Sequence, residues 1–194
     1  MEDIAPGLLD KVRKQFNRDI EKNEIIKNFR KQAKNGNLTY SQANDATWEI
    51  GKILAKAYSD NLSADVLPDG KMYYNIASRV LNPTLKAAYG MAVDNAETVQ
   101  KMMNEAAGIG IKVMRAQIRQ ENIDGIINRI SEEESFDNIK WILDAPVRNL
   151  IQKAMDDTIK ANADFHADAG LKPQIIRRSS GHCCKWCSQM AGIY

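Results

Sequence analysis

Apolar residues recur at spacings of three to five along the first part of the chain, as Leu8, Leu9, Val12, Phe16, Ile20, Ile25, Ile26 and Phe29. This period is that of one face of an α-helix, so it predicts an amphipathic helix over 8–35, broken near Asn23 and ending at Asn35-Gly36. Thr39 or Ser41 is suited to cap a second helix, which reaches about Ala64 and carries Trp48, Ile50, Ile53, Leu54, Ala57 and Leu62.

Proline and glycine divide the middle of the chain. The run from Val66 to Gly70 contains Pro-Asp-Gly and predicts a turn. A helix over 71–81 should stop at Asn82-Pro83, because proline lacks the N–H that continues a helix. A new helix should start with Pro83 in its first turn and end before Gly108. The pattern of residues 111–118 fits a strand and a helix equally well.

The second half of the chain again has helical spacing. Four isoleucines, at 123, 126, 127 and 130, predict a short helix. Ser131 and Glu134 stand at capping-box spacing and predict the start of the next helix, over 136–143. Pro146 then begins a long helix that Gly170 ends. Beyond it, the β-branched pair at 175 and 176 predicts a short strand.

These patterns predict a mainly α protein. We expect a multi-helical, elongated or bundle-like body over residues 1–170. A short β/knuckle module that contains all three cysteines should begin in residues 171–194, and we expect it to be incomplete there. With 44% hydrophobic and 27% charged residues the composition is globular, and no apolar run approaches the ~20 residues of a membrane helix. No membrane partner is expected.

Positive charge is concentrated near the N-terminus, although the net charge is only +2. Residues 11–34 hold nine Lys or Arg against Asp19, Glu21 and Glu24. A basic helix of this kind can contact DNA phosphates or an acidic protein surface. The candidate nucleic-acid or partner-binding residues are Lys11, Arg13, Lys14, Arg18, Arg30 and Lys31. The alternative is a solvated helix face, since no aromatic stacking residues interleave with the basic ones.

The cysteines offer the clearest candidate chemistry. Cys184 and Cys187 have the C-x-x-C spacing with which two thiolates hold Zn²⁺, and Cys183 or His182 could add a third ligand. Structural zinc sites close with four ligands, so this is a half-site, which is completed by another chain, by further residues or not at all; zinc is expected only if the missing C-terminal ligands are present. Buried free thiols and a redox pair are the alternatives. The odd, partly adjacent cysteines favour a reducing compartment, with synthesis in the cytoplasm.

No catalytic arrangement accompanies these cysteines. Asp164, His166 and Asp168 lie on one predicted helix, but His166 points away from the other two. Gly108-x-Gly110 lacks the remaining glycines and the Lys-Ser pair of a phosphate loop. There is no nucleophile elbow and no H-E-x-x-H helix. We therefore expect no enzymatic activity.

The last residues also carry a resemblance. The pattern Gly181-x-Cys183-Cys184-x-Trp186-Cys187-x-x-Met190-Ala191-Gly192-x-Tyr194 resembles the C-terminal signature of tailed-phage minor head proteins, the head-morphogenesis or Mu F-like group of Gram-positive phages and prophages. The runs 66–77, 107–110, 124–127 and 156–165 are similar to other segments of that group. In the group a His-x-x-Cys-x-Cys-like element follows, so the resemblance implies a C-terminal truncation here.

The resemblance implies a structural role in the virion. Such a protein is a minor component of the phage head that acts in head assembly at or near the portal vertex, made in the host cytoplasm and in some cases ejected with the DNA. Its partners would be the portal, capsid or scaffolding protein, and packaged DNA. Two alternatives stay open: a DNA-binding protein that uses the basic N-terminal helix, and a phage-delivered effector whose catalytic part is absent from these residues.

Overall fold

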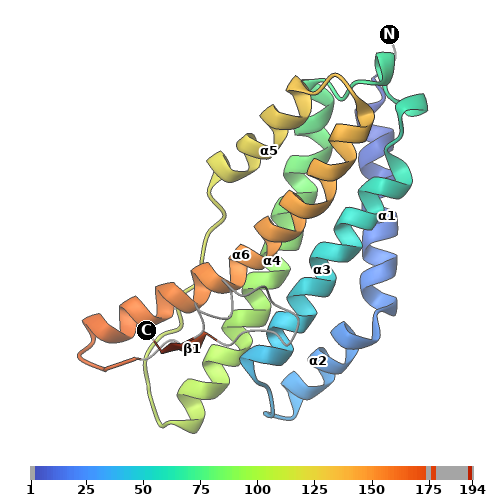
Figure 1. Ribbon diagram of the computed structural model, residues 1–194. Coiled ribbons are helices and arrows are strands. Elements are labelled where there is room, and N and C mark those ends of the chain that lie inside the picture. The colour runs from blue at the N-terminus through green and yellow to red at the C-terminus, as the bar shows by residue number, and fades with distance from the viewer. Residues whose placement is uncertain (1–2, 174–175, 178–191, 194) are drawn as a thin grey trace.

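The computed structural model describes residues 3–173, 176–177 and 192–193. Its main elements are six α-helices (Figure 1). They are α1 (Ala5–Lys22), α2 (Glu24–Lys34), α3 (Tyr40–Asn61), α4 (Tyr74–Ala106), α5 (Gln120–Glu132) and α6 (Phe136–Asp168). Two 3₁₀ turns, η1 (Ala64–Val66) and η2 (Pro68–Gly70), join α3 to α4. The prediction of a mainly α, bundle-like body is confirmed.

The helices form a bundle around α3 and α4. The most extensive packing joins α3, α4 and α6 to one another, while α1 packs against both α3 and α4. In Figure 1 these four helices lie side by side along the body, α5 lies beside α4 and α6, and α2 crosses the lower end. Their inward side chains form one hydrophobic core, to which every helix contributes. No helix within the described ranges is long and apolar enough to span a membrane.

The break predicted at Asn23 is confirmed. Asn23 has extended backbone angles, φ −71° and ψ 121°, and its side-chain oxygen accepts a hydrogen bond from the Ile26 N–H at 3.0 Å. It therefore caps the start of α2, and α1 and α2 are separate helices. The cap predicted for the next helix is also confirmed: Thr39 and Gln42 form a capping box at the start of α3.

Both helix boundaries predicted at proline, the stop at Pro83 and the start at Pro146, are wrong. Pro83 lies inside α4 and Pro146 lies inside α6, each of which is a single helix of 33 residues. A proline inside a helix costs about 3 kcal/mol because it removes a hydrogen bond and clashes with the preceding turn. Around Pro83 this cost is opposed by burial, since Leu81 and Leu85 on either side are 0% exposed. Tertiary packing therefore carries the helix through the proline.

The helix start predicted at Ser131 is also wrong. Ser131 lies in the last turn of α5, where its hydroxyl donates to the Asn128 carbonyl at 2.9 Å. The cap of α6 is Ser135, whose side-chain oxygen accepts from the Asp137 N–H. The boundary lies within the acidic run: Glu132 is still helical, and Glu133 has extended backbone angles, φ −77° and ψ 134°.

Residues 107–119 connect α4 to α5 without regular secondary structure. Gly108, with φ 66°, ends α4, as the sequence predicts. The next residues pass along α4 and α6, where two buried asparagines hold the backbone. The Asn162 side chain accepts from the Met114 N–H and donates to the Met114 carbonyl, both at 2.8 Å, while Asn104 donates to the Ile111 carbonyl at 3.3 Å. The segment is therefore neither strand nor helix, and asparagine side chains supply hydrogen-bond partners for its backbone at Ile111 and Met114.

The C-terminal end of α6 follows the prediction. The helix ends at Asp168, and Gly170 takes the left-handed conformation, φ 83°, that glycine adopts without strain. The Leu171 N–H donates to the His166 carbonyl at 3.0 Å, which closes the last turn. Beyond it, two-residue strands β1 (Ile176–Arg177) and β2 (Gly192–Ile193) pair antiparallel.

Candidate partner-binding groove between α3 and α6

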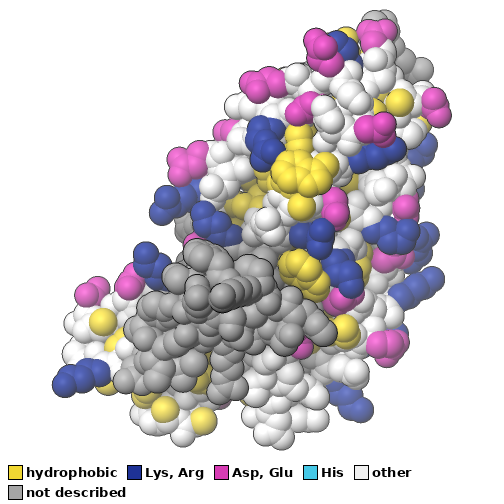
Figure 2. Space-filling view, in the orientation of Figure 1, with side chains coloured by type: hydrophobic (Ala, Val, Ile, Leu, Met, Phe, Trp, Pro, Cys, Tyr) yellow, Lys and Arg dark blue, Asp and Glu magenta, His cyan; other side chains and the backbone are white. Residues whose placement is uncertain are grey.

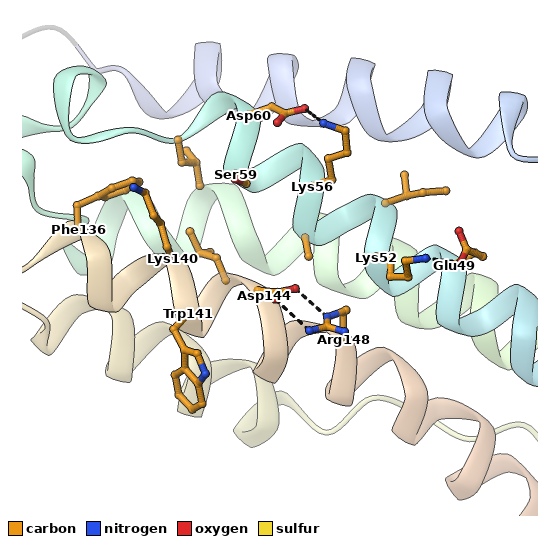
Figure 3. Close-up of a pocket in the computed structure, with 14 residues that line it drawn as sticks. Glu49, Lys52, Lys56, Ser59, Asp60, Phe136, Lys140, Trp141, Asp144 and Arg148 are labelled. Carbon is orange, nitrogen blue, oxygen red and sulfur yellow. Dashed lines mark hydrogen bonds and ion pairs between the residues drawn. The ribbon is translucent and has the colours of Figure 1, made fainter. Parts of the chain in front are cut away.

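A groove of about 800 Å³ lies between α3 and α6 (Figure 3). The two helices run antiparallel: Asn44 near the start of α3 bonds Gln152 of α6, whereas Leu62 after α3 shares the groove with Phe136 at the start of α6. Small and apolar residues, including Ala55, Ser59 and Leu143, line the groove between charged walls. Its position on two long, well-packed helices makes it a rigid surface.

Gly51 sets the separation of the two helices. A Cβ atom placed on this buried glycine would lie 3.2 Å from the Arg148 Cα and 3.5 Å from its Cγ. Any side chain here would therefore press against the α6 backbone. The absence of one lets α3 and α6 approach closely and brings the Arg148 side chain against α3.

Arg148 links the two walls of the groove. Its Nε and Nη2 donate to the two carboxylate oxygens of Asp144 at 2.7 and 3.0 Å, a bidentate geometry that fixes the guanidinium plane. The guanidinium carbon lies 5.2 Å from the ring centroid of Trp48, which is 40% exposed. This cation–π contact holds a tryptophan ring at the surface of α3.

A second tryptophan lies on the rim of the groove. Trp141 of α6 is 59% exposed, and the Arg129 guanidinium of α5 lies 5.4 Å from its ring centroid. Figure 3 shows the Trp141 ring directed away from α3, toward α5. Figure 2 shows hydrophobic side chains interleaved with Lys and Arg on this face of the body. Tryptophan and arginine are the residue types most enriched at the energetic centres of protein interfaces.

The charges along the groove are balanced. Lys52 pairs with Glu49 at 2.7 Å, and Lys140 pairs with Asp137 at 3.2 Å. Hydrogen bonds from Lys56 and Gln15 lower the pKa of Asp60 below its ordinary value. Balanced walls do not attract a strongly charged ligand, so the groove suits a protein surface with apolar and mixed polar groups.

The predicted basic residues are exposed but do not form one surface. Lys11, Lys14 and Arg18 lie along one side of α1, and Arg13 lies on its other flank. The break at Asn23 places Arg30 and Lys31 on a different helix. On α1, Lys14 pairs with Asp10 at 2.7 Å and Arg18 with Asp19 at 2.9 Å.

The predicted zinc half-site, Cys184, Cys187, Cys183 and His182, lies outside the described residues. Within the ranges the structure describes, no three His, Cys, Asp or Glu side chains are grouped so as to hold a metal ion. His166 is 7% exposed and belongs to the packed side of α6, while Asp164 is exposed.

The exposure of Trp48 and Trp141 was not predicted from the sequence, where Trp48 stands among the apolar residues of its predicted helix. Helical geometry contained the signal: Trp48 lies about 200° around the helix from the buried Ile50, and Trp141 about 100° from the buried Ile142. Neither ring can share the centre of its helix's buried face. The role of Gly51 could not be read from the sequence, because no local pattern marks its close approach to Arg148 of α6.

Comparisons with known proteins add no relative. No protein-family model, curated protein or solved structure matches the chain.

Proposed function

We propose that the protein is a minor structural component of a tailed-phage head, which acts in head assembly at or near the portal vertex and binds a portal, capsid or scaffolding protein. The sequence resemblance to minor head proteins suggests this class. The observation that carries the binding role is the pair of exposed tryptophans, Trp48 and Trp141, each held by an arginine beside the α3–α6 groove. The same proposal places the protein in the virion, after synthesis in the host cytoplasm.

The groove presents to a partner two tryptophan rings that are already held in position by arginines. A ring that is pre-positioned by a cation–π contact loses little conformational freedom when it is buried in an interface. The ion pairs on the walls supply a polar rim that sets the orientation of a partner. A helical body with a rigid aromatic surface suits a docking function during assembly.

Copurification with head proteins tests the proposal. The chain is coexpressed with the portal, capsid and scaffolding genes of a phage or prophage that encodes it, and complexes are isolated through a tag on the portal or procapsid. We expect the wild type to copurify and Trp141→Ala to reduce its recovery at least tenfold, since interface tryptophans commonly contribute about 2 kcal/mol or more.

Tyr74→Ala is the matched control. Tyr74 is 51% exposed at the start of α4 and does not line the groove, so its replacement should leave recovery unchanged. A wild-type chain that copurifies with none of these head proteins would refute the proposal. Equal losses for the two variants would refute the role of the groove.

A further inference from the structure

The outer face of α2 carries an uninterrupted row of positive charge. Lys27, Arg30, Lys31 and Lys34 follow the spacing i, i+3, i+4, i+7, which places them on one side of a helix, and all four are exposed. A neighbouring side of α2 packs against the core through Ile26 and Phe29. The seven-residue span corresponds to about 10 Å along the helix axis. The break at Asn23 therefore gives α2 a separate basic surface, at the lower end of the body in Figure 1.

Beyond Glu24 at its start, neither α2 nor the connection that follows contains an acidic residue. Residues 25–44 contain these four cations and no Asp or Glu. Glu24, the single acid of α2, pairs with Lys27 at 2.8 Å and leaves the other three cations without an ion pair in the part of the chain that the structure describes. Asn28 and Asn35, both exposed, add amide donors beside them. The row is thus a concentrated donor surface for anions.

The basic residues of α1 are in a different electrostatic environment. Acids lie among them on the same helix, where Lys14 pairs with Asp10 and Arg18 with Asp19. The hydrogen bond and charge of Asp19 raise the pKa of the Arg18 guanidinium, and Asp60 of α3 adds a smaller contribution. Two cations of α1 are therefore paired with acids of the same helix, whereas on α2 only Lys27 is paired, with Glu24.

We propose that the outer face of α2, and not α1, binds the phosphate backbone of double-stranded DNA. Duplex DNA carries one negative charge per ~1.7 Å of its axis, so a row of four cations meets several phosphates at once. An acidic protein partner fits less well, because an interface of that kind is built around aromatic or apolar residues. The exposed apolar residue of α2, Ile25, lies beside the buried stripe, away from the four cations.

The test compares two charge-matched variants of the full chain. Arg30→Glu/Lys34→Glu changes α2, and Lys11→Glu/Arg13→Glu changes α1. Each removes two cations and adds two acids at exposed positions, so both variants have the same net charge. Binding to a duplex of random sequence is measured by fluorescence anisotropy from about 50 to about 200 mM salt, the range over which phosphate contacts weaken steeply. Circular dichroism confirms that the variants are folded.

We expect the wild type to bind with an affinity that falls as salt rises. The α2 variant should reduce the magnitude of the slope of log K against log salt by about 2, because each lost phosphate contact removes about 0.9. The α1 variant should keep the wild-type slope. If the α2 reversal unfolds the helix, Arg30→Gln/Lys34→Gln supplies the same comparison, with its own α1 match in Lys11→Gln/Arg13→Gln.

Three outcomes overturn the inference. The first is that the wild type does not bind duplex DNA at the lowest salt. The second is that the two variants weaken binding equally, which indicates an effect of net charge. The third is that polyglutamate displaces the labelled duplex as well as unlabelled duplex DNA does at equal charge concentration, which would mean that the α2 cations bind acidic protein surfaces. None of these measurements depends on the α3–α6 groove, so the inference and the proposed head function fail separately.

Discussion

Replacement of Gly51 by alanine tests the close approach of α3 and α6. Two effects oppose each other at this position. Alanine favours the helical state over glycine by about 1 kcal/mol. Its Cβ, however, would lie 3.2 Å from the Arg148 Cα, a backbone atom that moves only if α6 shifts. Overpacking of this kind costs about 1–3 kcal/mol. We therefore expect Gly51→Ala to change the free energy of unfolding by between zero and a loss of about 2 kcal/mol.

Gly90 and Gly125 provide the matched comparison. Both lie inside helices, in α4 and α5, and a Cβ added at either would meet no atom within 4 Å. Their replacement by alanine should gain about 1 kcal/mol each, because only the helix propensity changes. In a domain of this size 1 kcal/mol corresponds to about 2–4 °C in Tm. The expected difference between Gly51→Ala and Gly90→Ala is therefore clearly measurable.

Urea denaturation followed by far-UV circular dichroism gives these free energies. Gly51→Val should destabilise more than Gly51→Ala, since a branched side chain deepens the contact with α6 and is a poorer helix former. Separation of the helices should also move Arg148 away from Trp48 and change tryptophan fluorescence. If Gly51→Ala gains as much stability as Gly90→Ala, the close approach of α3 to α6 is refuted.

Further predictions concern the packed interior. Asn162→Ala leaves the Met114 N–H and carbonyl without their partners, so we expect a loss of about 1–3 kcal/mol in urea denaturation and faster exchange of the Met114 amide; unchanged exchange would contradict this. Pro83→Ala restores a helical hydrogen bond and should raise stability by up to ~3 kcal/mol, whereas a loss would mean that the proline geometry itself is needed. Burial raises the pKa of Tyr40 to about 12 and also raises that of Tyr58, so the unfolded chain ionises first. Stability should be complete below about pH 10 and fall as the pH rises toward 12, by about 1.4 kcal/mol per pH unit for each tyrosine, and a flat alkaline profile would contradict this.

Local chemistry made part of the fold predictable. Asn23 and Thr39 act through their own side chains on nearby N–H groups, so their effect is visible in the sequence. Pro83 and Pro146 also act locally, but there the burial of neighbouring residues outweighs the cost of the proline, and that burial depends on distant helices. The sequence therefore predicts most helices, the break at Asn23 and the cap at Thr39, but it divides α4 and α6 wrongly.

The candidate groove could not be predicted in the same way. It exists because Gly51 and Arg148 meet across a long stretch of intervening sequence, and no local pattern encodes that contact. The exposure of Trp48 and Trp141 follows from helix phase, which helical geometry could have indicated. The separation of the basic residues into two surfaces could have been predicted from the sequence, because it follows from the helix break predicted at Asn23.

The pairing of α3 with α6 also has a consequence for the order of folding during synthesis. The ribosome releases α3 long before α6, yet α6 covers a side of both α3 and α4. Until α6 emerges, that apolar side stays open to solvent, and a nascent chain with α1 to α5 alone is exposed to aggregation. The body closes only when its last long helix docks, so α6 acts as the completing element of the fold. A chaperone that protects the nascent chain would therefore be needed most between the release of α3 and the arrival of α6.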